Sequence, residues 1–489
     1  MENRKHISTT KLYPFVIAAV VVVISFVTAY FGFVQGLAIA VVPLVVLLLF
    51  KVIQNPFYGF ILLFIFNYFI IAIMRYSGLS GLSVIVDVIM ALVFVAFALN
   101  AAFGSTGFGV QNQASLLNGL VFVASLWFIY CLFELFNPTA MTNVWLLNRG
   151  LTAYMLAVVL LTFVVFKNYH NLNTIVMLLS VLVLLSVAKA LMQKYIGFDA
   201  AEQRDLNEGL ANTHLLATGT RYFSIYVSAG IFGAVMGHAM VVFGILSLYT
   251  HLRWKRIYFI IVALVSLYGL LISGTRGALA VPMAGLCLFT ILSKRLKLMI
   301  PTAGILVVGY LFLAMTTIGQ SNYLIRRMRT AFDPNEPSLI VRKENQKLFA
   351  AYLSDKPFGE GVGLSGVDTQ HLSMRYTTSI PTDSWYVKIW VETGIVGLCL
   401  HLFMLAYIII YGSWIILFRI RDYRLRGMLT ALHCGVFGIL ASSYGNQVLG
   451  QFPVAIIVYM SMALVFMGPY FDRQITGDTL PWGTRLINK

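Results

Sequence analysis

Long apolar runs constrain the fold of this chain more than any other feature of its sequence. About fourteen runs are predicted as transmembrane helices, because about 20 apolar residues cross a bilayer as a helix. With 60% hydrophobic and 11% charged residues, the composition excludes a soluble globular domain. We predict an all-α, polytopic membrane protein of about 12–14 helices, with 1–489 as one membrane domain. The expected spans are 14–34, 36–50, 57–75, 80–102, 116–136, 147–166, 171–193, 222–249, 257–274, 277–292, 298–318, 394–418, 427–446 and 452–471.

The cysteines and the net charge exclude two other classes of protein. All four cysteines lie inside apolar runs, and none has the spacing of metal ligands or of a disulfide framework. We therefore predict no metal site and no cofactor. The net charge of +16 would suggest a nucleic-acid partner in a soluble protein, but here the charges mark the topology, so none is predicted. Membrane lipids are the expected surroundings.

The short basic loops predict the orientation of the chain. Lysine and arginine are enriched in cytoplasmic loops. With the N-terminus inside, the basic loops 251–256, 293–297 and 419–426 also fall inside, as does the C-terminal tail. Two polar segments then lie on the outer side: a smaller loop, 194–221, and a large loop, 319–384.

The large outer loop is expected to contain a helix. After Pro337, the segment "SLIVRKENQKLFAAYLSD" places apolar residues at helical spacing. Ser338 is the expected N-cap and Pro357 the expected stop. A glycine-rich turn, "FGEGVGLSG", follows. We expect an amphipathic helix near 339–354 that lies on the outer face of the membrane.

Four arginines stand on the outer side, against the charge trend. Arg276 lies in the apolar segment "LYGLLISGTRGALAVPMAGL", at the turn between two expected spans, and Arg149, Arg221 and Arg342 are also outer. The planar guanidinium fork suits phosphate or carboxylate. Together they would bind a polyanion, and a lipid-linked pyrophosphate fits a site in a membrane. The alternative is that each arginine reaches outer headgroups by itself. No nucleotide-binding loop stands between a strand and a helix.

Several segments together resemble one family. "ISGTRGALAV" resembles the "SGSRGA" segment of the O-antigen ligase and polymerase superfamily, and "RYFSIYVSAGIFGA" is similar to its segment after the first large outer loop. "VRKENQKLFAAYLSDKPFGEGVG" is similar to its Arg-led helix with the proline and Gly-x-Gly turn that follow. In "TDSWYVKIWVETGIVGL", nine residues separate Ser384 from Gly394 and Gly397, as in the family. The resemblance spans roughly residues 149–450.

The resemblance implies a membrane glycosyltransferase that needs neither metal nor nucleotide. Its donor would be an undecaprenyl-pyrophosphate-linked glycan, and its acceptor a glycan or glycolipid at the periplasmic face of the inner membrane. It implies pyrophosphate binding by Arg221, Arg276, Arg342 and Arg149. The products expected of such enzymes are lipopolysaccharide or exopolysaccharide. Both chain termini are expected to be cytoplasmic.

One residue departs from the family. The family's ligases carry a histidine that acts on the acceptor hydroxyl, where this chain has Asp383. An aspartate can serve as a base, and the change favours a polymerase over a ligase. Alternatively, Asp383 caps the helix that begins near Ser384. His371 is the second candidate for the catalytic group, unless it is a solvated loop residue.

Two other classes of function stay open from the sequence. Ionisable residues in or near the spans (Asp87, Glu134, Lys189, His238 and His433) could serve a transporter such as a lipid-linked oligosaccharide flippase. Because they are scattered over different spans, pairing between helices explains them equally well. A non-catalytic polysaccharide assembly protein is the other alternative, which the change at Asp383 permits.

Overall fold

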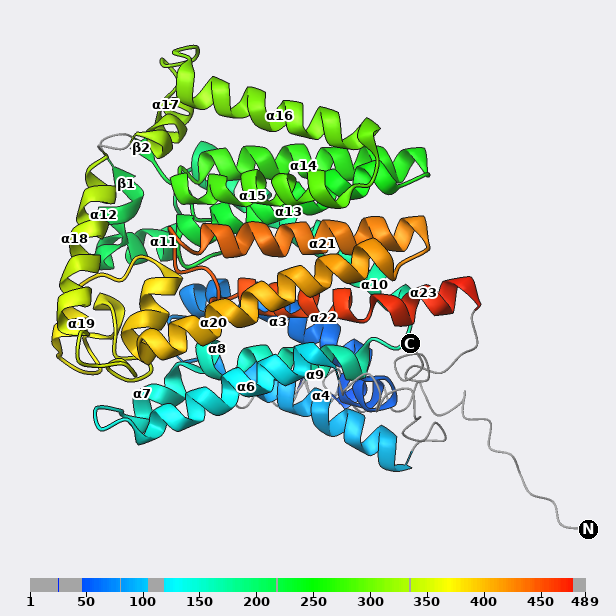
Figure 1. Ribbon diagram of the computed structural model, residues 1–489, viewed down its shortest axis with the longest axis horizontal. Coiled ribbons are helices and arrows are strands. Elements are labelled where there is room, and N and C mark those ends of the chain that lie inside the picture. The colour runs from blue at the N-terminus through cyan, green and yellow to red at the C-terminus, as the bar shows by residue number, and fades with distance from the viewer. Residues whose placement is uncertain are drawn as a thin grey trace, which may run out of the picture. The chain divides into compact units, whose positions relative to one another are not determined.

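The computed structural model describes residues 46–79, 81–103, 118–216, 219–333 and 336–477, and residue 25 alone. The first expected span and most of the second lie outside this part of the chain. The chain divides into two compact units, 1–62 with 89–107, and 63–88 with 108–489. The second unit carries all the predicted site residues. Figure 1 shows its helices, most of which run side by side.

The described residues are mostly helical. Their one pair of strands is the hairpin of β1 (Leu215–Leu216) and β2 (Gly219–Thr220). The helices are α3 (Pro56–Ser77), α4 (Val84–Phe103), α6 (Gly119–Phe133), η2 (Glu134–Phe136), α7 (Thr142–Leu147), α8 (Arg149–Thr152), α9 (Tyr154–Val165), α10 (Tyr169–Tyr195), α11 (Ala200–Asp205), η3 (Leu206–Leu210), α12 (Ala211–His214), α13 (Ala229–Tyr249), α14 (Arg253–Ile272), η4 (Arg276–Leu279), α15 (Ala280–Leu292), α16 (Leu296–Met315), α17 (Tyr323–Arg329), η5 (Thr330–Phe332), α18 (Pro337–Tyr352), η6 (Val367–Thr369), α19 (Tyr376–Ser379), α20 (Trp385–Phe418), α21 (Tyr423–Ser442), α22 (Val454–Phe466) and α23 (Gly468–Thr476).

The all-α, multi-pass prediction is confirmed. Among the described residues, nine helices are long and apolar enough to cross a membrane, or ten if α22 and α23 form one bent span. Every expected span from 57–75 onward has a helical counterpart. The span expected at 147–166 is divided into the short helix Arg149–Thr152 and the apolar helix Tyr154–Val165. The span expected at 277–292 corresponds to Arg276–Leu292, which begins with a 3-10 turn. Hydropathy does not show such short turns at the helix starts.

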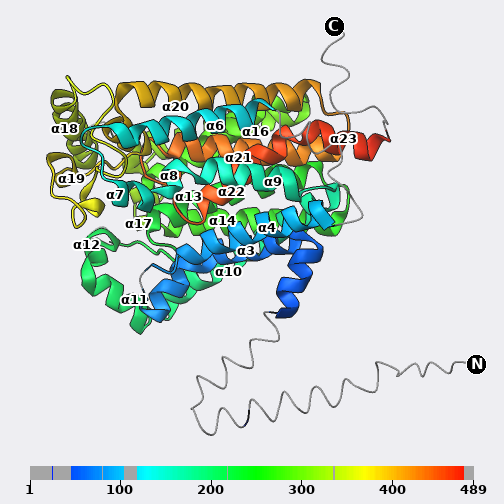
Figure 2. The same ribbon diagram turned by 90° about the horizontal axis from the view of Figure 1, so that it is seen from below.

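Helix α13 lies at the centre of the second unit. It packs against α14, α15 and α21, and Figures 1 and 2 show these helices side by side. Small residues allow this close packing, as is common between helices in membranes. A Cβ at Gly237 would come within 2.9 Å of Val281 on α15 and 3.0 Å of Leu270 on α14. Helix α16, by contrast, is almost entirely exposed, as expected of a helix that faces lipid.

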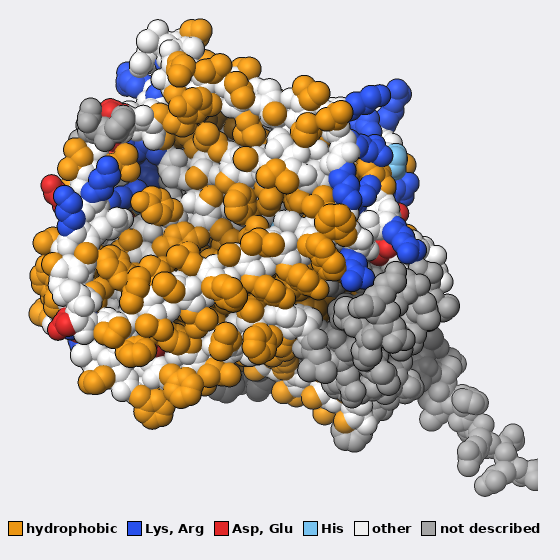
Figure 3. Space-filling view, viewed as in Figure 1, with side chains coloured by type: hydrophobic (Ala, Val, Ile, Leu, Met, Phe, Trp, Pro, Cys, Tyr) orange, Lys and Arg blue, Asp and Glu red, His pale blue; other side chains and the backbone are white. Residues whose placement is uncertain are grey.

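The two ends of the helices in the second unit differ in character. Helices α11, α12, α17, α18 and α19 gather at one end (Figures 1 and 2). The basic loops meet at the other end, where the Tyr423 ring lies 5.8 Å from the His251 ring and 4.3 Å from the Arg295 guanidinium. Figure 3 shows Lys and Arg side chains gathered there, beyond helix sides covered with hydrophobic side chains. The three basic loops therefore lie at the end opposite to the helices of the large loop.

A backbone break in α20 sets the position of the large loop. Gly394 interrupts the helix with φ 68°, a conformation that glycine adopts without strain. The turn after α18 lies against this break, where the Val396 amide donates to the Pro357 carbonyl at 3.3 Å. The Gly361 amide donates to the Glu392 carbonyl at 3.0 Å. The apolar span expected at 394–418 therefore begins at the break, and Trp385–Thr393 forms a separate helical segment above it.

Candidate functional site

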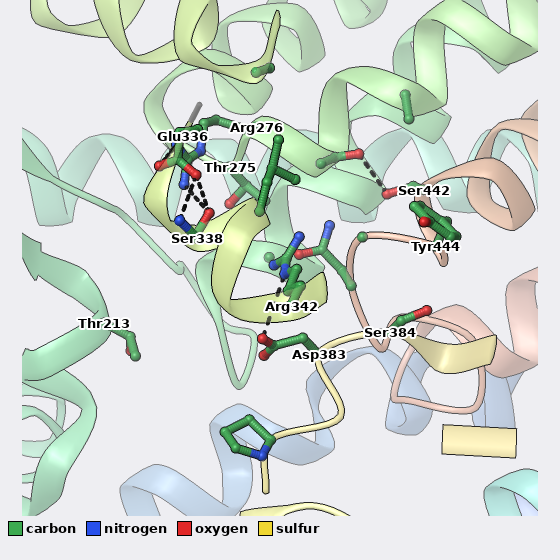
Figure 4. Close-up of a pocket in the computed structure, with 18 of the residues that line it drawn as sticks. Thr213, Thr275, Arg276, Glu336, Ser338, Arg342, Asp383, Ser384, Ser442 and Tyr444 are labelled. Carbon is green, nitrogen blue, oxygen red and sulfur yellow. Dashed lines mark hydrogen bonds and ion pairs between the residues drawn. The ribbon is translucent and has the colours of Figure 1, made fainter. Parts of the chain in front are cut away.

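A cavity of about 840 Å³ lies at the end of the second unit that carries the large loop. Its walls come from the start of α13, from η4 and α17, from α18, and from the segments that precede α20 and follow α21. Figure 4 shows Arg276 and Arg342 with Glu336 and Asp383 at this cavity. Five cations and three carboxylates line it, an excess of two positive charges: Arg221, Arg276, Arg327, Arg342 and Lys343, with Glu336, Asp368 and Asp383.

Arg276 stands at a tight turn between α14 and α15. Gly274, at φ 57°, turns the chain after α14 ends at Ile272. The Arg276 guanidinium then reaches the large loop and forms an ion pair with Glu336. It also donates from Nη1 to the Thr330 hydroxyl at 3.2 Å and from Nη2 to the Ser338 hydroxyl at 3.0 Å. The planar fork is therefore held by oxygen acceptors on the facing segment.

Glu336 begins the predicted loop helix. It is the N-cap of α18, and its carboxylate accepts from the Ser338 amide at 3.0 Å. The expected N-cap, Ser338, is therefore wrong, because proline occupies the first helical position and Glu336 supplies the acceptor. The helix also ends at Tyr352, before Pro357. Burial raises the pKa of Glu336, but the Ser338 hydrogen bonds and the Arg276 charge outweigh it and hold this pKa below its ordinary value.

Helix α18 packs onto the start of α20. Phe349 and Leu353 are buried with Val387 and Val391 of α20. Two more of its predicted apolar positions, Val341 and Leu348, are about half exposed. The amphipathic helix that the sequence predicts is present, and its buried side faces protein.

Arg221 approaches Arg276 from the β-hairpin. It follows β2 and donates from Nη1 to the Thr213 carbonyl and from Nη2 to the Thr275 hydroxyl, both at 2.9 Å. Its Nε is buried and donates no hydrogen bond within the described residues. Burial and the positive charges of Arg327 and Arg276 lower the pKa of Arg221 to about 10. An anion would relieve both effects, because it would offer an acceptor and neutralise the repulsion.

Arg327 is a site residue that the sequence interpretation missed. It lies on α17 and donates from Nε to the Gly274 carbonyl. Burial and the charge of Arg276 lower its pKa. A signal was present, because "YLIRRMRT" carries three arginines on the side expected to be outer. Asn446 was also missed. Its Nδ2 is buried in the cavity wall without an acceptor in the described part of the chain.

Arg342 and Asp383 meet across the cavity. Arg342, on α18, places its Nε 3.5 Å from the Asp383 carboxylate (Figure 4). Asp383 has φ 47°, a left-handed conformation in which Asp, Asn and His are the commonest residues after glycine. The N-cap of α20 is Ser384. The proposal that Asp383 caps this helix is therefore wrong, since its carboxylate, 44% exposed, points into the cavity instead.

The backbone around Asp383 is held from two sides. The Trp385 amide donates to the Ser443 carbonyl at 2.9 Å, next to the end of α21. Asn345 of α18 donates from its amide to the Pro381 carbonyl at 3.3 Å. Asp383 is thus fixed between α18 and the segment after α21, while its own carboxylate stays accessible.

Two predicted site residues lie elsewhere. Arg149 does not line the cavity but pairs with Asp87, with 2.6 Å between its Nε and the carboxylate. It also donates to the Tyr154 hydroxyl at 3.2 Å. His371 is exposed, lies after η6 and is not part of the cavity wall. The structure therefore brings together three of the four predicted arginines and one of the two predicted catalytic residues.

The ionisable residues near the spans are accounted for in part by pairing. Asp87 binds Arg149, and Lys189 binds Asp199 and Glu202 at 2.8 and 2.9 Å. Glu134 accepts from the Asn137 amide at 3.3 Å. These contacts join neighbouring helices and loops, and they do not form a chain of titratable groups across the described bundle.

Residues 261–402 match a protein-family model, the one described as O-antigen ligase. This segment is similar to the O-antigen ligase family. The predicted resemblance to the O-antigen ligase and polymerase superfamily is confirmed over this segment, which is under a third of the chain. No curated protein matches the chain.

The segment that matches the O-antigen ligase model supplies most of the cavity's charge. Arg276, Arg327, Arg342 and Asp383 lie inside the matched segment. Arg221 and Asn446 lie outside it and complete the wall from either side in the sequence. The match to this family model therefore supports glycan ligation or polymerisation of the O-antigen type by this multi-pass membrane protein.

Proposed function

We propose that this cavity joins a glycan carried on undecaprenyl pyrophosphate to a sugar hydroxyl of an acceptor glycan or glycolipid, without metal or nucleotide. The observation that carries the proposal is the convergence of Arg221, Arg276, Arg327 and Arg342 on one cavity. A lipid-linked pyrophosphate fits a cavity at the end of a helical bundle, because its polyprenyl chain would stay in the membrane while its phosphates reach the helix ends.

The arginines act on the leaving group. As the bond between the anomeric carbon and the phosphate oxygen breaks, that oxygen keeps the electron pair and its negative charge grows. Preorganised cations that face growing charge are worth several kcal/mol of activation free energy, about 3–4 for a single donor. The buried, unpaired Nε of Arg221 and the fork of Arg276 are suited to this role.

Asp383 acts on the acceptor. In this proposal the acceptor hydroxyl attacks the anomeric carbon, its proton passes to the Asp383 carboxylate, and the pyrophosphate leaves on the opposite side. Direct displacement inverts the anomeric carbon. The 3.5 Å contact with Arg342 orients the carboxylate between the leaving group and the acceptor. Arg149 has no part in this step, because its fork is occupied by Asp87.

We also propose on which side of the membrane the cavity lies. The cavity end faces the periplasm and the basic loops face the cytoplasm, because of the positive-inside trend. Aspartate in place of the ligases' histidine favours an exopolysaccharide or O-antigen polymerase over a ligase. Single cysteines placed at exposed positions of the large loop and of loop 419–426 test the direction with an impermeant thiol reagent in intact cells. Labelling of the second position without the first would refute it.

The function is tested by glycan transfer from purified donor in liposomes. Arg276→Lys keeps the charge but loses the planar fork, so we expect at least a tenfold lower rate, consistent with the loss of about 1.4 kcal/mol of transition-state stabilisation. Arg424→Lys, an exposed arginine at the other end, is the matched control. Full activity of Arg276→Lys would refute the phosphate role. Donor movement across the bilayer without transfer would favour a flippase.

A further inference from the structure

A second cavity, of about 790 Å³, lies at the opposite end of the second unit, among the basic loops. Its wall combines the ends of α13 and α14, the turn between α15 and α16, and the first residue of α21. Four cations line it: Arg256, Lys294, Arg295 and Lys297. No aspartate or glutamate among the described residues belongs to its wall, whereas three carboxylates line the first cavity.

The four cations lack counter-charges. None of them forms an ion pair in the part of the chain that the structure describes. Arg256 donates from Nε and Nη2 to the Thr250 carbonyl at 3.2 and 3.1 Å. Lys294 donates to the Leu417 carbonyl. These contacts fix the direction of the side chains and leave their positive charge uncompensated.

An aromatic ring positions one of the arginines. The Arg295 guanidinium lies 4.3 Å from the centroid of the Tyr423 ring, and its Nη1 donates to the Tyr423 hydroxyl at 3.3 Å. The guanidinium therefore lies over a ring at the start of a different helix, α21. Arg256 lies in the first turn of α14 and Arg295 directly before α16, so their convergence is not a consequence of one basic run in the sequence.

The surroundings are those of a membrane interface. Leu248 and Leu296 line the same cavity and are 41% and 67% exposed. Trp254, in the first turn of α14 with Arg256, is 59% exposed. Exposed apolar side chains next to a tryptophan and cations mark the level where acyl chains meet headgroups. A small soluble anion would use the cations and leave these apolar side chains in water.

We infer that this cavity is a binding site for the headgroup of an anionic phospholipid, whose phosphate is held by Arg256, Arg295, Lys294 and Lys297 and whose acyl chains cover Leu248 and Leu296. The inference is independent of the proposed glycan transfer, because no residue of the first cavity takes part. The basic loops would then bind a specific lipid in addition to orienting the chain in the membrane.

The test counts bound lipid by native mass spectrometry of the full chain released from nanodiscs. The nanodiscs contain phosphatidylcholine with increasing phosphatidylglycerol. The site variant carries Arg256→Gln, Arg295→Gln and Lys297→Gln. Its matched control carries Arg253→Gln, Lys255→Gln and Arg424→Gln, which remove the same charge from the same end but do not line the cavity. We expect one phosphatidylglycerol to be retained by the wild type and by the control.

The site variant should bind phosphatidylglycerol roughly a hundredfold more weakly, because each cation near an anionic surface contributes about fivefold. Equal losses in both variants would overturn the inference and leave only general surface charge. Displacement of the lipid by millimolar inorganic phosphate, with no preference for phosphatidylglycerol, would identify a soluble-anion site instead. If the triple variant does not fold, Lys297→Gln alone should weaken retention about fivefold, and unchanged retention would refute the site.

Discussion

Replacing Glu336 with glutamine should lower stability and at the same time tighten binding of the donor. In the structure the Glu336 carboxylate occupies the Arg276 fork and caps α18. If Arg276 binds phosphate, this carboxylate holds the position that a phosphate would take. Glutamine keeps an oxygen for the Ser338 amide but loses the charge that competes with phosphate.

The magnitude follows from the burial of the pair. The side chains of Arg276 and Glu336 are 25% and 15% exposed. Hydrogen bonds to charged groups contribute about 1.5–3 kcal/mol, while exposed ion pairs contribute at most about 1 kcal/mol. We expect Glu336→Gln to lower the free energy of unfolding by about 1 kcal/mol, towards the exposed limit because glutamine keeps the cap. A phosphate would no longer have to displace the Glu336 carboxylate from Arg276, and the same amount, about 1 kcal/mol, should tighten pyrophosphate binding roughly fivefold.

Two measurements test the expected loss of stability and the expected gain in pyrophosphate binding. Calorimetric titration of the detergent-solubilised protein with a short-chain polyprenyl pyrophosphate gives the dissociation constant, and thermal unfolding gives the stability. Glu344→Gln is the matched control, because Glu344 is exposed on the same helix and does not line the cavity. Since the pKa of Glu336 is lowered by folding, its contribution to stability is complete above its ordinary pKa of 4.5. The difference between wild type and Glu336→Gln should vanish as the pH falls through the lowered pKa of the folded state.

One result would refute this reasoning. If Glu336→Gln weakens pyrophosphate binding, the carboxylate does not compete with phosphate but helps to build the site. Equal changes in the control would show that the net charge of α18, and not the Arg276 pair, is responsible.

Three further predictions concern the remaining charged residues. Asp383→Asn should nearly abolish transfer in liposomes while pyrophosphate binding and unfolding stay unchanged, because asparagine tolerates φ 47° but accepts no proton. Asp383→Ala should in addition lower the free energy of unfolding by about 1–2 kcal/mol, since alanine is strained there. Arg327→Gln should weaken pyrophosphate binding about tenfold, as expected for the loss of a charged contact of about 1.4 kcal/mol, and calorimetry measures it. Arg149→Gln should leave pyrophosphate binding unchanged and lower the unfolding temperature, because Asp87 loses its ion-pair partner. Weaker binding would show that Arg149 belongs to the binding site.

The spans were predictable because the bilayer imposes a simple rule on the sequence. A run of about 20 apolar residues can be recognised as a span from the sequence alone. The expected spans from 57–75 onward all have helical counterparts. The starts of the helices were less predictable. The N-cap of α18 depends on which acceptor reaches the first free amides, and Glu336 reaches the Ser338 amide across Pro337. The sequence analysis expected Ser338, because serine is a far commoner N-cap than glutamate.

The sequence pointed to arginines of the candidate site only where they depart from the positive-inside trend. Arg276 and Arg221 were predicted as site residues because they lie on the side expected to be outer, where arginine is scarce. Arg327 stands beside two other arginines in one short helix, and nothing local distinguishes the one that faces the cavity. Arg149 violated the same rule, but its partner Asp87 lies on another helix. The contact between them requires the tertiary fold.

The family motifs acquire a physical meaning when they are placed next to each other. The Pro357 turn and the Gly394 break lie far apart in the sequence, yet the Pro357 carbonyl accepts from the Val396 amide beside that break. A side chain at Gly394 would collide with the Pro357 carbonyl. The contact fixes the end of α18 against α20, and therefore sets how far Arg342 extends over Asp383. Glycine at 394 and the proline turn thus act on the cavity through the backbone, and a larger residue at 394 should separate Arg342 from Asp383 without touching either.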